Sequence, residues 1–277
     1  MKIGVNVFGL KKVLKNDDCF FALKQAGISS VELCSIIGNE LPDVSNYSDN
    51  VKDKIRVIRN AFLTFDENEE RIERIKANGL EVKGAHIGVL SKPFENPLFV
   101  AEQLICFGRN NGLNYFVIGV EGTVDGAQTI IPNINLIAQK LKRAGMELVY
   151  HNHHIECVAE SDGRSILGCI MESCRDLRYQ FDVGWLHYAG IDVLEFLNRY
   201  KNVIHSIHLK DFLIENGKPV FVSLGSGCVP IEKALLFAKE NSTCDTLIID
   251  QDDSEDILSD VVKGYKFIKN FLEKERR

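Results

Sequence analysis

Short apolar runs rich in β-branched residues alternate along the chain with longer segments of helical period. The apolar runs predict strands at residues 2–7, 29–34, 81–89, 114–120, 146–152, 178–184, 204–210 and 246–252. Their apolar character is nearly continuous, which is typical of parallel strands that are buried on both faces. Segments such as "DDCFFALKQAG" and "NINLIAQKLKRAG" lie between them and predict helices. The pattern therefore predicts eight βα units.

Four predicted helices end in a glycine that is followed at once by a strand. The junctions are "KQAGISSVEL", "KANGLEVKGA", "RNNGLNYFVI" and "KRAGMELVYH". Glycine adopts the left-handed conformation that closes a helix, so the same αβ junction recurs along the chain. Eight βα units in 277 residues favour one (β/α)8 barrel domain over residues 1–277, since such barrels typically need ~250 residues. The region 35–80 is longer than one βα unit needs and is expected to carry an extra helix.

Neither GxGxxG nor GxxxxGK[ST] follows the first strand, which argues against an open nucleotide-binding sheet. In a barrel, catalytic residues are expected where the strands end, at the carboxyl face. Ionisable residues do gather at the predicted strand ends. They are Glu32, His86, His151, His153, Glu156, Asp182, His208, Lys210, Asp211, Asp250 and Asp252.

This mixture of carboxylates and imidazoles indicates one divalent cation. Mn²⁺ is the first expectation, with Zn²⁺, Co²⁺ or Mg²⁺ as alternatives. The sequence contains no cysteine cluster of the kind that binds a structural zinc ion. No GxSxG sequence marks a serine nucleophile. A cation held by carboxylates and histidine can polarise a carbonyl, so that a nearby base removes the adjacent C–H proton to give an enediolate. The residues thus point to isomerisation, epimerisation or β-elimination of a hydroxy ketone.

The composition of the chain limits the kinds of binding partner that we expect. The net charge of −6 argues against nucleic acid and anionic membranes, which attract basic surfaces. No apolar run approaches the ~18 residues of a membrane span, and "MKIGVNVFGL" does not read as a signal peptide. Eight scattered cysteines without a CxxC pair indicate reduced thiols and a cytoplasmic protein. We expect a small-molecule substrate, no nucleic-acid or membrane partner, and possible homo-oligomers.

Five segments in order, "YHNHHIE", "FDVGWLHYAG", "HLKDF", "LGSGCV" and "IIDQD", resemble the xylose isomerase-like TIM-barrel superfamily. The most similar branch is the sugar phosphate isomerase/epimerase family, including inosose dehydratase-like proteins. The resemblance implies one divalent cation held by a glutamate, an aspartate, a histidine and a second glutamate. In this sequence those positions correspond to Glu156, Asp182, His208 and Asp250.

Two departures from that pattern affect the expected ligands. Many relatives place the strand-five glutamate where this chain has His151, so His151 can be the ligand and Glu156 a neighbouring contact. The last position is usually glutamate, whereas Asp250 is shorter by one methylene.

These observations predict a metal-dependent isomerase or epimerase acting on a small sugar, keto sugar or cyclitol. The expected base is His151, His153 or Glu156, and Lys210 is expected to stabilise the oxyanion or donate a proton. Glu32, His86 and Trp185 are expected to contact substrate. The alternative is a lyase on the same barrel, by dehydration or 3-keto-glycoside elimination. More distant alternatives are a non-catalytic sugar-binding relative and an apurinic endonuclease-like protein.

Simpler roles remain open for several of these residues. His208 could be a hydrogen-bonded core histidine, Asp182 could cap the following helix, and Lys210 could be a solvated lysine. "LGSGCV" could cradle a phosphate or form an ordinary tight turn before a helix near Pro230. If strand five continues to His153, the side chains of His151 and His153 face the barrel mouth, Tyr150 faces the helices and His154 is solvated.

Overall fold

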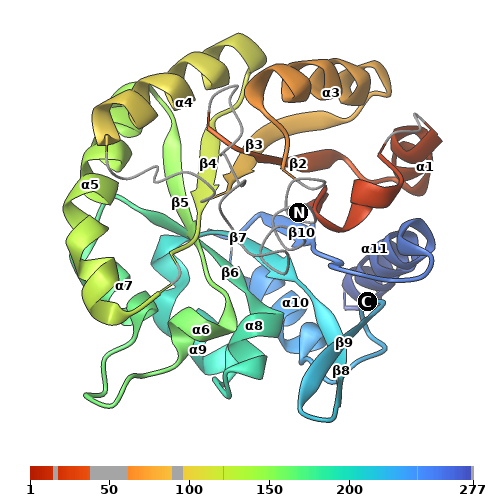
Figure 1. The fold of residues 1–277 in the computed structure, drawn as a ribbon. Helices are drawn as coiled ribbons and strands as arrows, with labels where there is room; N and C mark the ends of the chain where they lie inside the picture. Colours follow the sequence, from red (N-terminus) through yellow and green to blue (C-terminus); the bar gives the residue numbers. More distant parts are fainter. Residues whose placement is uncertain (15–17, 38–61, 89–95, 121, 242, 276–277) are drawn as a thin grey trace.

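The protein was analysed as a computed structural model that describes residues 1–14, 18–37, 62–88, 96–120, 122–241 and 243–275. Eight parallel strands close into a barrel in the order β1-β10-β7-β6-β5-β4-β3-β2 (Figure 1). The strands are β1 (Lys2–Asn6), β2 (Ser30–Ser35), β3 (Glu81–Ile87), β4 (Tyr115–Ile118), β5 (Glu147–His151), β6 (Arg178–Asp182), β7 (Ile204–Leu209) and β10 (Thr246–Ile249). Each corresponds to one predicted strand, so the (β/α)8 barrel is confirmed.

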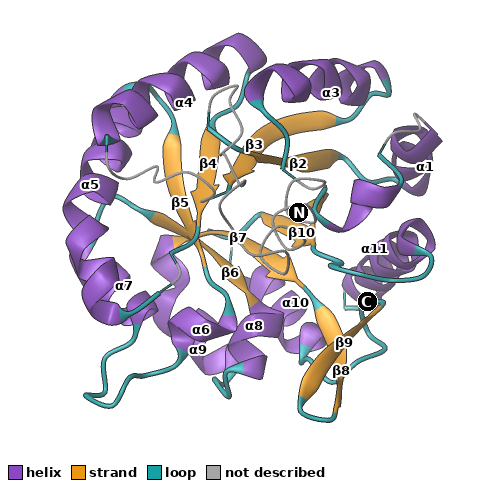
Figure 2. Ribbon diagram, viewed as in Figure 1, coloured by secondary structure: helices purple, strands orange, loops and turns teal. Residues whose placement is uncertain are grey.

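Helices surround the barrel on its outside (Figure 2). The longer ones are α1 (Asp18–Ala26), α3 (Phe65–Ala77), α4 (Pro97–Asn111), α5 (Val124–Arg143), α7 (Ile166–Ser173), α9 (Val193–Tyr200), α10 (Ile231–Glu240) and α11 (Ile257–Lys274). Shorter ones are α6 (His154–Cys157), α8 (Val183–Tyr188) and the 3-10 turns η1 (Gly9–Lys12) and η2 (Lys201–Val203). Residues 38–61, in the region where an extra helix is predicted, lie outside the described residues. None of the described helices combines the length and the apolarity that crossing a membrane requires.

The four predicted glycine junctions are confirmed by their backbone conformation. Gly27, Gly79, Gly112 and Gly145 all have positive φ, between 74° and 97°. In this left-handed region a residue with a Cβ is strained, which explains why glycine ends these helices.

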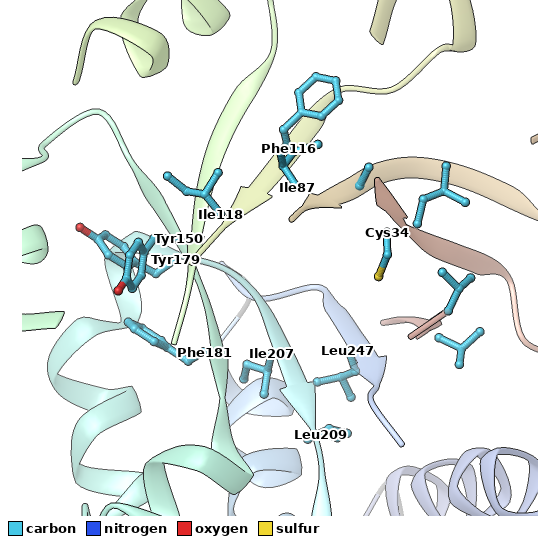
Figure 3. Close-up of a cluster of buried hydrophobic side chains, with 14 of the residues drawn as sticks. Cys34, Ile87, Phe116, Ile118, Tyr150, Tyr179, Phe181, Ile207, Leu209 and Leu247 are labelled. Carbon is cyan, nitrogen blue, oxygen red and sulfur yellow. The ribbon is translucent and has the colours of Figure 1, made fainter. Parts of the chain in front are cut away.

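The main hydrophobic core lies between the strands and the surrounding helices (Figure 3). Phe181 packs against Phe196 of α9, and the Tyr179 hydroxyl donates to the Ile170 carbonyl of α7. Tyr150 lies beside Tyr179 in this layer, with ring centroids 6.1 Å apart. The prediction that Tyr150 faces the helices is therefore confirmed, and the alternation of a strand turns His151 to the inside.

An antiparallel hairpin that the sequence analysis did not predict follows β7 directly. It consists of β8 (Asp211–Glu215) and β9 (Lys218–Val222). Its turn contains Asn216 and Gly217, both with positive φ. An Asn-Gly pair between two largely apolar segments, here "DFLIE" and "KPVFV", is a strong hairpin signal, and it could have revealed this element.

Candidate active site

A cavity of about 430 Å³ opens at the carboxyl ends of the strands. Its polar lining consists of Asn6, His86, His151, His153, Lys210, Asp250 and Asp252. Its apolar walls include Phe8, Phe62 and Trp185. The cavity therefore gathers most of the ionisable residues that the sequence placed at strand ends.

Four of these strand-end residues form one compact group of possible cation ligands. His151, Asp182, His208 and Asp250 each offer a ligand atom, and these atoms lie within 4.8 Å of one another. The barrel's register explains why they meet: Asp182 of β6 is paired with His208 of β7, and Asp250 directly follows β10 beside β7. All four side chains are buried.

Three of the four residues contain a buried atom that makes no hydrogen bond. These atoms are His151 Nδ1, Asp182 Oδ2 and Asp250 Oδ1. The other Asp182 oxygen accepts a hydrogen bond from the Trp185 amide at 2.9 Å, so Asp182 also caps α8. Buried polar atoms are nearly always hydrogen-bonded, and three without a hydrogen bond in a single group are the arrangement expected of cation ligands, although Asp182 Oδ2 does lie 3.5 Å from the Lys210 ammonium. The residues present therefore fit a divalent cation.

Lys210 supplies a positive charge beside this group. Its Nζ lies 2.6 Å from Asp252, 3.0 Å from Asp250 and 3.5 Å from Asp182, and only 3% of its side chain is exposed. Burial alone would lower the pKa of Lys210, but the three carboxylates outweigh it and raise that pKa. Lys210 is thus a buried, charged ammonium, and a solvated surface position is wrong.

His208 bridges two carboxylates instead of bonding a backbone carbonyl. Its Nδ1 lies 3.1 Å from Asp250 Oδ2 and its Nε2 lies 3.0 Å from Glu32 Oε1. Burial opposes protonation, but these two partners outweigh it and raise the pKa of His208 to about 10. For Asp250, burial would raise the pKa, yet Lys210 and His208 keep it below the ordinary value.

Glu32 lies beneath the cavity, in the barrel interior, with 2% of its side chain exposed. Both of its oxygens accept hydrogen bonds from protein groups. Burial would raise the pKa of Glu32, but its interactions with His86 and the hydrogen bond from His208 hold that pKa well below its usual range. In this arrangement Glu32 does not line the mouth cavity, whereas His86 and Trp185 do.

The carboxylate of Glu156 is paired with His153 and is not one of the four grouped residues. Glu156 Oε1 lies 3.0 Å from His153 Nδ1, and Glu156 Oε2 accepts from the His153 amide at 3.2 Å. Burial would lower the pKa of His153, but the hydrogen bond to Glu156 raises it. Glu156 itself is fully buried. The pair holds the imidazole of His153 at the edge of the cavity.

Strand five does not continue to His153, the condition under which the side-chain directions were predicted. β5 ends at His151, and His153 precedes the short helix α6, because Glu156 captures its backbone amide. Both His151 and His153 nevertheless line the cavity, as expected. His154 is partly buried, with its ring centroid 5.2 Å from that of Trp185 and 5.0 Å from that of Tyr188, so it is a packed residue and not a freely solvated one.

The glycine turn in "LGSGCV" is occupied by the protein's own carboxylate. Asp211 accepts hydrogen bonds from the amides of Gly225, Gly227 and Val229 at 2.9 to 3.1 Å. A Cβ on Gly227 would lie 2.1 Å from Asp211 Oδ1, which explains the glycine. These amides are not free for a phosphate, so the tight-turn interpretation holds, and α10 follows Pro230 as predicted.

Two polar residues inside the barrel were not predicted from the sequence. Gln180 donates to Glu32 at 2.8 Å, and its carbonyl oxygen lies 2.7 Å from His86 Nε2. Asn6 donates to Glu32 at 3.0 Å. Gln180 lies two residues before Asp182 on β6, so strand alternation places both on the inner face and could have identified it.

The curated proteins that resemble this chain in sequence share one name, inosose dehydratase. No family model matches the chain. Inosose dehydratase of Clostridium perfringens is 28% identical over 161 residues, which cover 51% of this chain and 54% of that protein. In that alignment the chain spans about half the length of the relative. Inosose dehydratase of Clostridium beijerinckii is 24% identical, and the alignment covers 88% of this chain and 88% of that protein.

Solved structures agree in fold. A sugar phosphate isomerase/epimerase from Parabacteroides distasonis superposes with a TM-score of 0.72 at 17% identity, covering 96% of this chain and 92% of the other. The IolI protein with a bound zinc atom gives a TM-score of 0.65 at 12% identity, with 99% of both chains covered. A xylose isomerase-like barrel from Mycobacterium smegmatis in complex with magnesium gives 0.64 at 12% identity, covering 98% and 96%. The predicted resemblance to these barrels, and to enzymes of the isomerase, epimerase and dehydratase type, is confirmed.

Proposed function

We propose that this chain is a divalent-metal-dependent isomerase or epimerase of a small keto sugar or cyclitol, built as one domain over residues 1–277. The observation that carries the proposal is the group of His151, Asp182, His208 and Asp250, with three buried atoms that make no hydrogen bond. In this assignment His151 replaces Glu156 as the fourth ligand, because Glu156 is already paired with His153.

A cation bound there would act as a Lewis acid toward the carbonyl of the substrate. Two imidazoles and two carboxylates suit Mn²⁺, Zn²⁺ or Co²⁺, and Mn²⁺ remains our first expectation. Mg²⁺ is less suited to a donor set with two nitrogens, because it prefers oxygen ligands.

His153 is the base in this proposal. Its Nδ1 faces the buried carboxylate of Glu156, which leaves Nε2 as the nitrogen able to take a proton from substrate carbon. A carboxylate behind a histidine fixes its tautomer and stabilises the imidazolium that forms. His151 is then a ligand and does not act as the base.

Lys210 supplies positive charge on the other side of the cavity. Its ammonium lies 4.8 Å from the centre of the Trp185 ring and is anchored by Asp252. In the proposed reaction it donates a hydrogen bond to the oxygen on which negative charge develops. Trp185 and His86 flank the substrate, and Trp185 offers an apolar face to the C–H side of a sugar or cyclitol ring.

A second candidate is a lyase that expels water after the same proton abstraction. The curated relatives favour it, since both Clostridium proteins are named inosose dehydratases. The two outcomes differ only after the proton has left carbon: an isomerase returns a proton, whereas a lyase loses the β-hydroxyl. Either enzyme is proposed to be cytoplasmic, in keeping with its eight free cysteines.

One experiment tests both candidates. Protein stripped with a chelator would be incubated in D₂O with keto sugars or inososes, with Mn²⁺, Zn²⁺ or Co²⁺ added singly, and followed by NMR. Deuterium in a recovered or rearranged ketose supports the isomerase or epimerase, and an enone or diketone product supports the lyase. Exchange that needs no metal, or no exchange with any metal, would overturn the proposal. His153→Ala should lose exchange, and its neighbour His154→Ala is the matched control.

A further inference from the structure

The most heavily hydrogen-bonded carboxylate inside the barrel is one to which the proposed reaction gives no role. Glu32 lies in the middle of β2, below the mouth cavity, and 2% of its side chain is exposed. Burying a carboxylate is costly unless it is fully hydrogen-bonded. The groups that contact Glu32 therefore indicate the role of its buried carboxylate.

Glu32 Oε1 is contacted by two histidines and one amide. His86 Nε2 lies 2.9 Å away, His208 Nε2 lies 3.0 Å away, and the Asn6 side-chain amide donates at 3.0 Å. A carboxylate oxygen only accepts, so the nitrogen that each histidine turns toward it carries a proton. One oxygen thus holds the Nε2 proton of both rings.

Glu32 Oε2 is held by donors from two other strands. The Tyr115 hydroxyl donates at 2.8 Å, and the Gln180 side-chain amide donates at 2.8 Å. The Gln180 carbonyl oxygen lies 2.7 Å from His86 Nε2 and is a second acceptor for the same proton. Hydrogen bonds to both oxygens thus fix the orientation of the Glu32 carboxylate.

Because Glu32 holds Nε2 of each ring, Nδ1 is the nitrogen that each ring turns to its other partners. His208 Nδ1 lies 3.1 Å from the carboxylate of Asp250 and by the same rule carries a second proton, so a cation bound at Nδ1 would displace that proton while Glu32 keeps the one on Nε2. With its proton on Nε2, His86 has an acceptor at Nδ1, and this ring lines the mouth cavity. A second hydrogen-bonding partner on a ligating histidine fixes its ring and typically changes metal affinity by ~10–100-fold.

We propose that Glu32 is a positioning residue that holds the Nε2 protons of His208 and His86, and so turns His208 Nδ1 to the cation and makes His86 an acceptor. The part concerning His208 rests on the cation site of the proposed function. Glu32 touches neither cation nor substrate, and it acts through the two histidines.

The test compares Glu32→Gln with Tyr115→Phe. Glutamine is nearly isosteric but brings an NH₂ group among donors and removes the charge. Phenylalanine removes one donor from Oε2 and leaves both histidine contacts. Zn²⁺ affinity, measured by competition with a chromophoric chelator, should fall ~10–100-fold in Glu32→Gln and change less than about threefold in Tyr115→Phe. Circular dichroism melting of both variants checks the fold.

Imidazole ¹⁵N NMR of the wild-type protein gives a second readout that needs no variant. The proton should be on Nε2 of His86 without metal, and on Nε2 of His208 with Zn²⁺ bound. Wild-type Zn²⁺ affinity in a folded Glu32→Gln variant, or an Nδ1 proton on His86, would overturn the role of Glu32. A wild-type protein that binds Zn²⁺ but shows no substrate exchange would instead overturn the proposed function and leave Glu32 its role.

Discussion

The two ends of the barrel each hold a polar cavity, and they differ in how their charges are paired. The floor cavity, at the amino ends of the strands, measures about 270 Å³, against about 430 Å³ at the mouth. On the floor, Lys2 lies 3.6 Å from Asp245, Lys83 lies 2.9 Å from Glu81, and Arg178 donates to a backbone carbonyl. Lys2 and Lys83 are thus paired with carboxylates, and Arg178 is hydrogen-bonded to the backbone.

At the mouth the pairing is incomplete. In the described part of the chain, none of the buried side-chain atoms that lack a hydrogen bond belongs to a residue lining the floor cavity. His151, Asp182 and Asp250 each carry such an atom at the mouth. Composition alone would not separate the two ends, since both contain histidine, lysine and carboxylates. Unmet hydrogen-bonding capacity does separate them, and it supports the mouth as the site of the proposed reaction, since barrels of this kind carry their active sites there.

The largest expected effect breaks the mouth group itself. Replacing Asp182 and His208 together by alanine removes two of the four proposed ligands, so stoichiometric binding of Mn²⁺, Zn²⁺ or Co²⁺ should be lost while the barrel stays folded. Metal content by atomic emission and secondary structure by circular dichroism check this. Asp245→Ala on the floor is the control and should bind metal as the wild type does. Full occupancy in the double variant would refute the site.

Next in size is the loss of the proposed base. His153→Ala should lower turnover by ~10²–10⁴-fold, the usual range for a general base, and leave metal affinity nearly unchanged. His154, partly buried against Trp185 and Tyr188, should tolerate alanine with little change in turnover. Initial rates and metal titrations on the two variants decide the matter. Equal losses of activity would mean that His153 has no special role.

A strand-end carboxylate that is already fully hydrogen-bonded should affect stability and not metal binding. Asp211 accepts from four backbone amides, so Asp211→Ala should lower the free energy of unfolding by about 3 kcal/mol, because those buried donors lose their acceptor. Metal affinity should change far less than in the Asp182 and His208 variant. Urea unfolding and a metal titration provide the two readouts. A large loss of metal with normal stability would contradict this distinction.

A smaller effect should appear in the pH dependence of metal binding. The pKa of His208, raised to about 10 by Asp250 and Glu32 against the effect of burial, keeps the ring protonated at neutral pH without metal. A ligating nitrogen must be free of its proton, so the cation displaces one proton and binds more tightly as the pH rises. Between pH 6 and 8 the affinity should increase about tenfold per pH unit for one proton. Calorimetry in buffers of different ionisation enthalpy counts the protons, and a flat profile would contradict the exchange.

The smallest effect belongs to the floor. Lys83→Met breaks an ion pair between partly exposed side chains, so the free energy of unfolding should change by less than about 1 kcal/mol. Metal affinity should not change. If this variant weakened metal binding as strongly as a mouth variant, the contrast between the two ends would fail.

The barrel was predictable because it depends on patterns within short segments. Apolar runs marked the eight strands, and glycine endings such as Gly27 and Gly79 marked the junctions between helix and strand. The gathering of His151, Asp182, His208 and Asp250 at one end followed from topology, since parallel strands bring their carboxyl ends together.

Other features depended on contacts between distant segments. Whether Glu156 or His151 joins the group was open in the sequence, and it turned on a local hydrogen bond between Glu156 and His153 that ends the strand early. Asp211 looked like one more acidic residue at a strand end, and only the folded turn at 225–229 shows its carboxylate to be structural.

The sequence by itself determined the barrel, the end at which polar residues gather and the class of chemistry their side chains allow. Periodicity and residue type carry that information, and neither needs a distance. The tertiary structure alone decided which gathered groups are paired. A hydrogen bond between Glu32 and His208 joins residues 176 positions apart and depends on ångström-scale register across the barrel. Contacts of this kind separate the buried polar atoms that are hydrogen-bonded within the fold from the single atoms of His151, Asp182 and Asp250 that make no hydrogen bond and that we propose bind a cation.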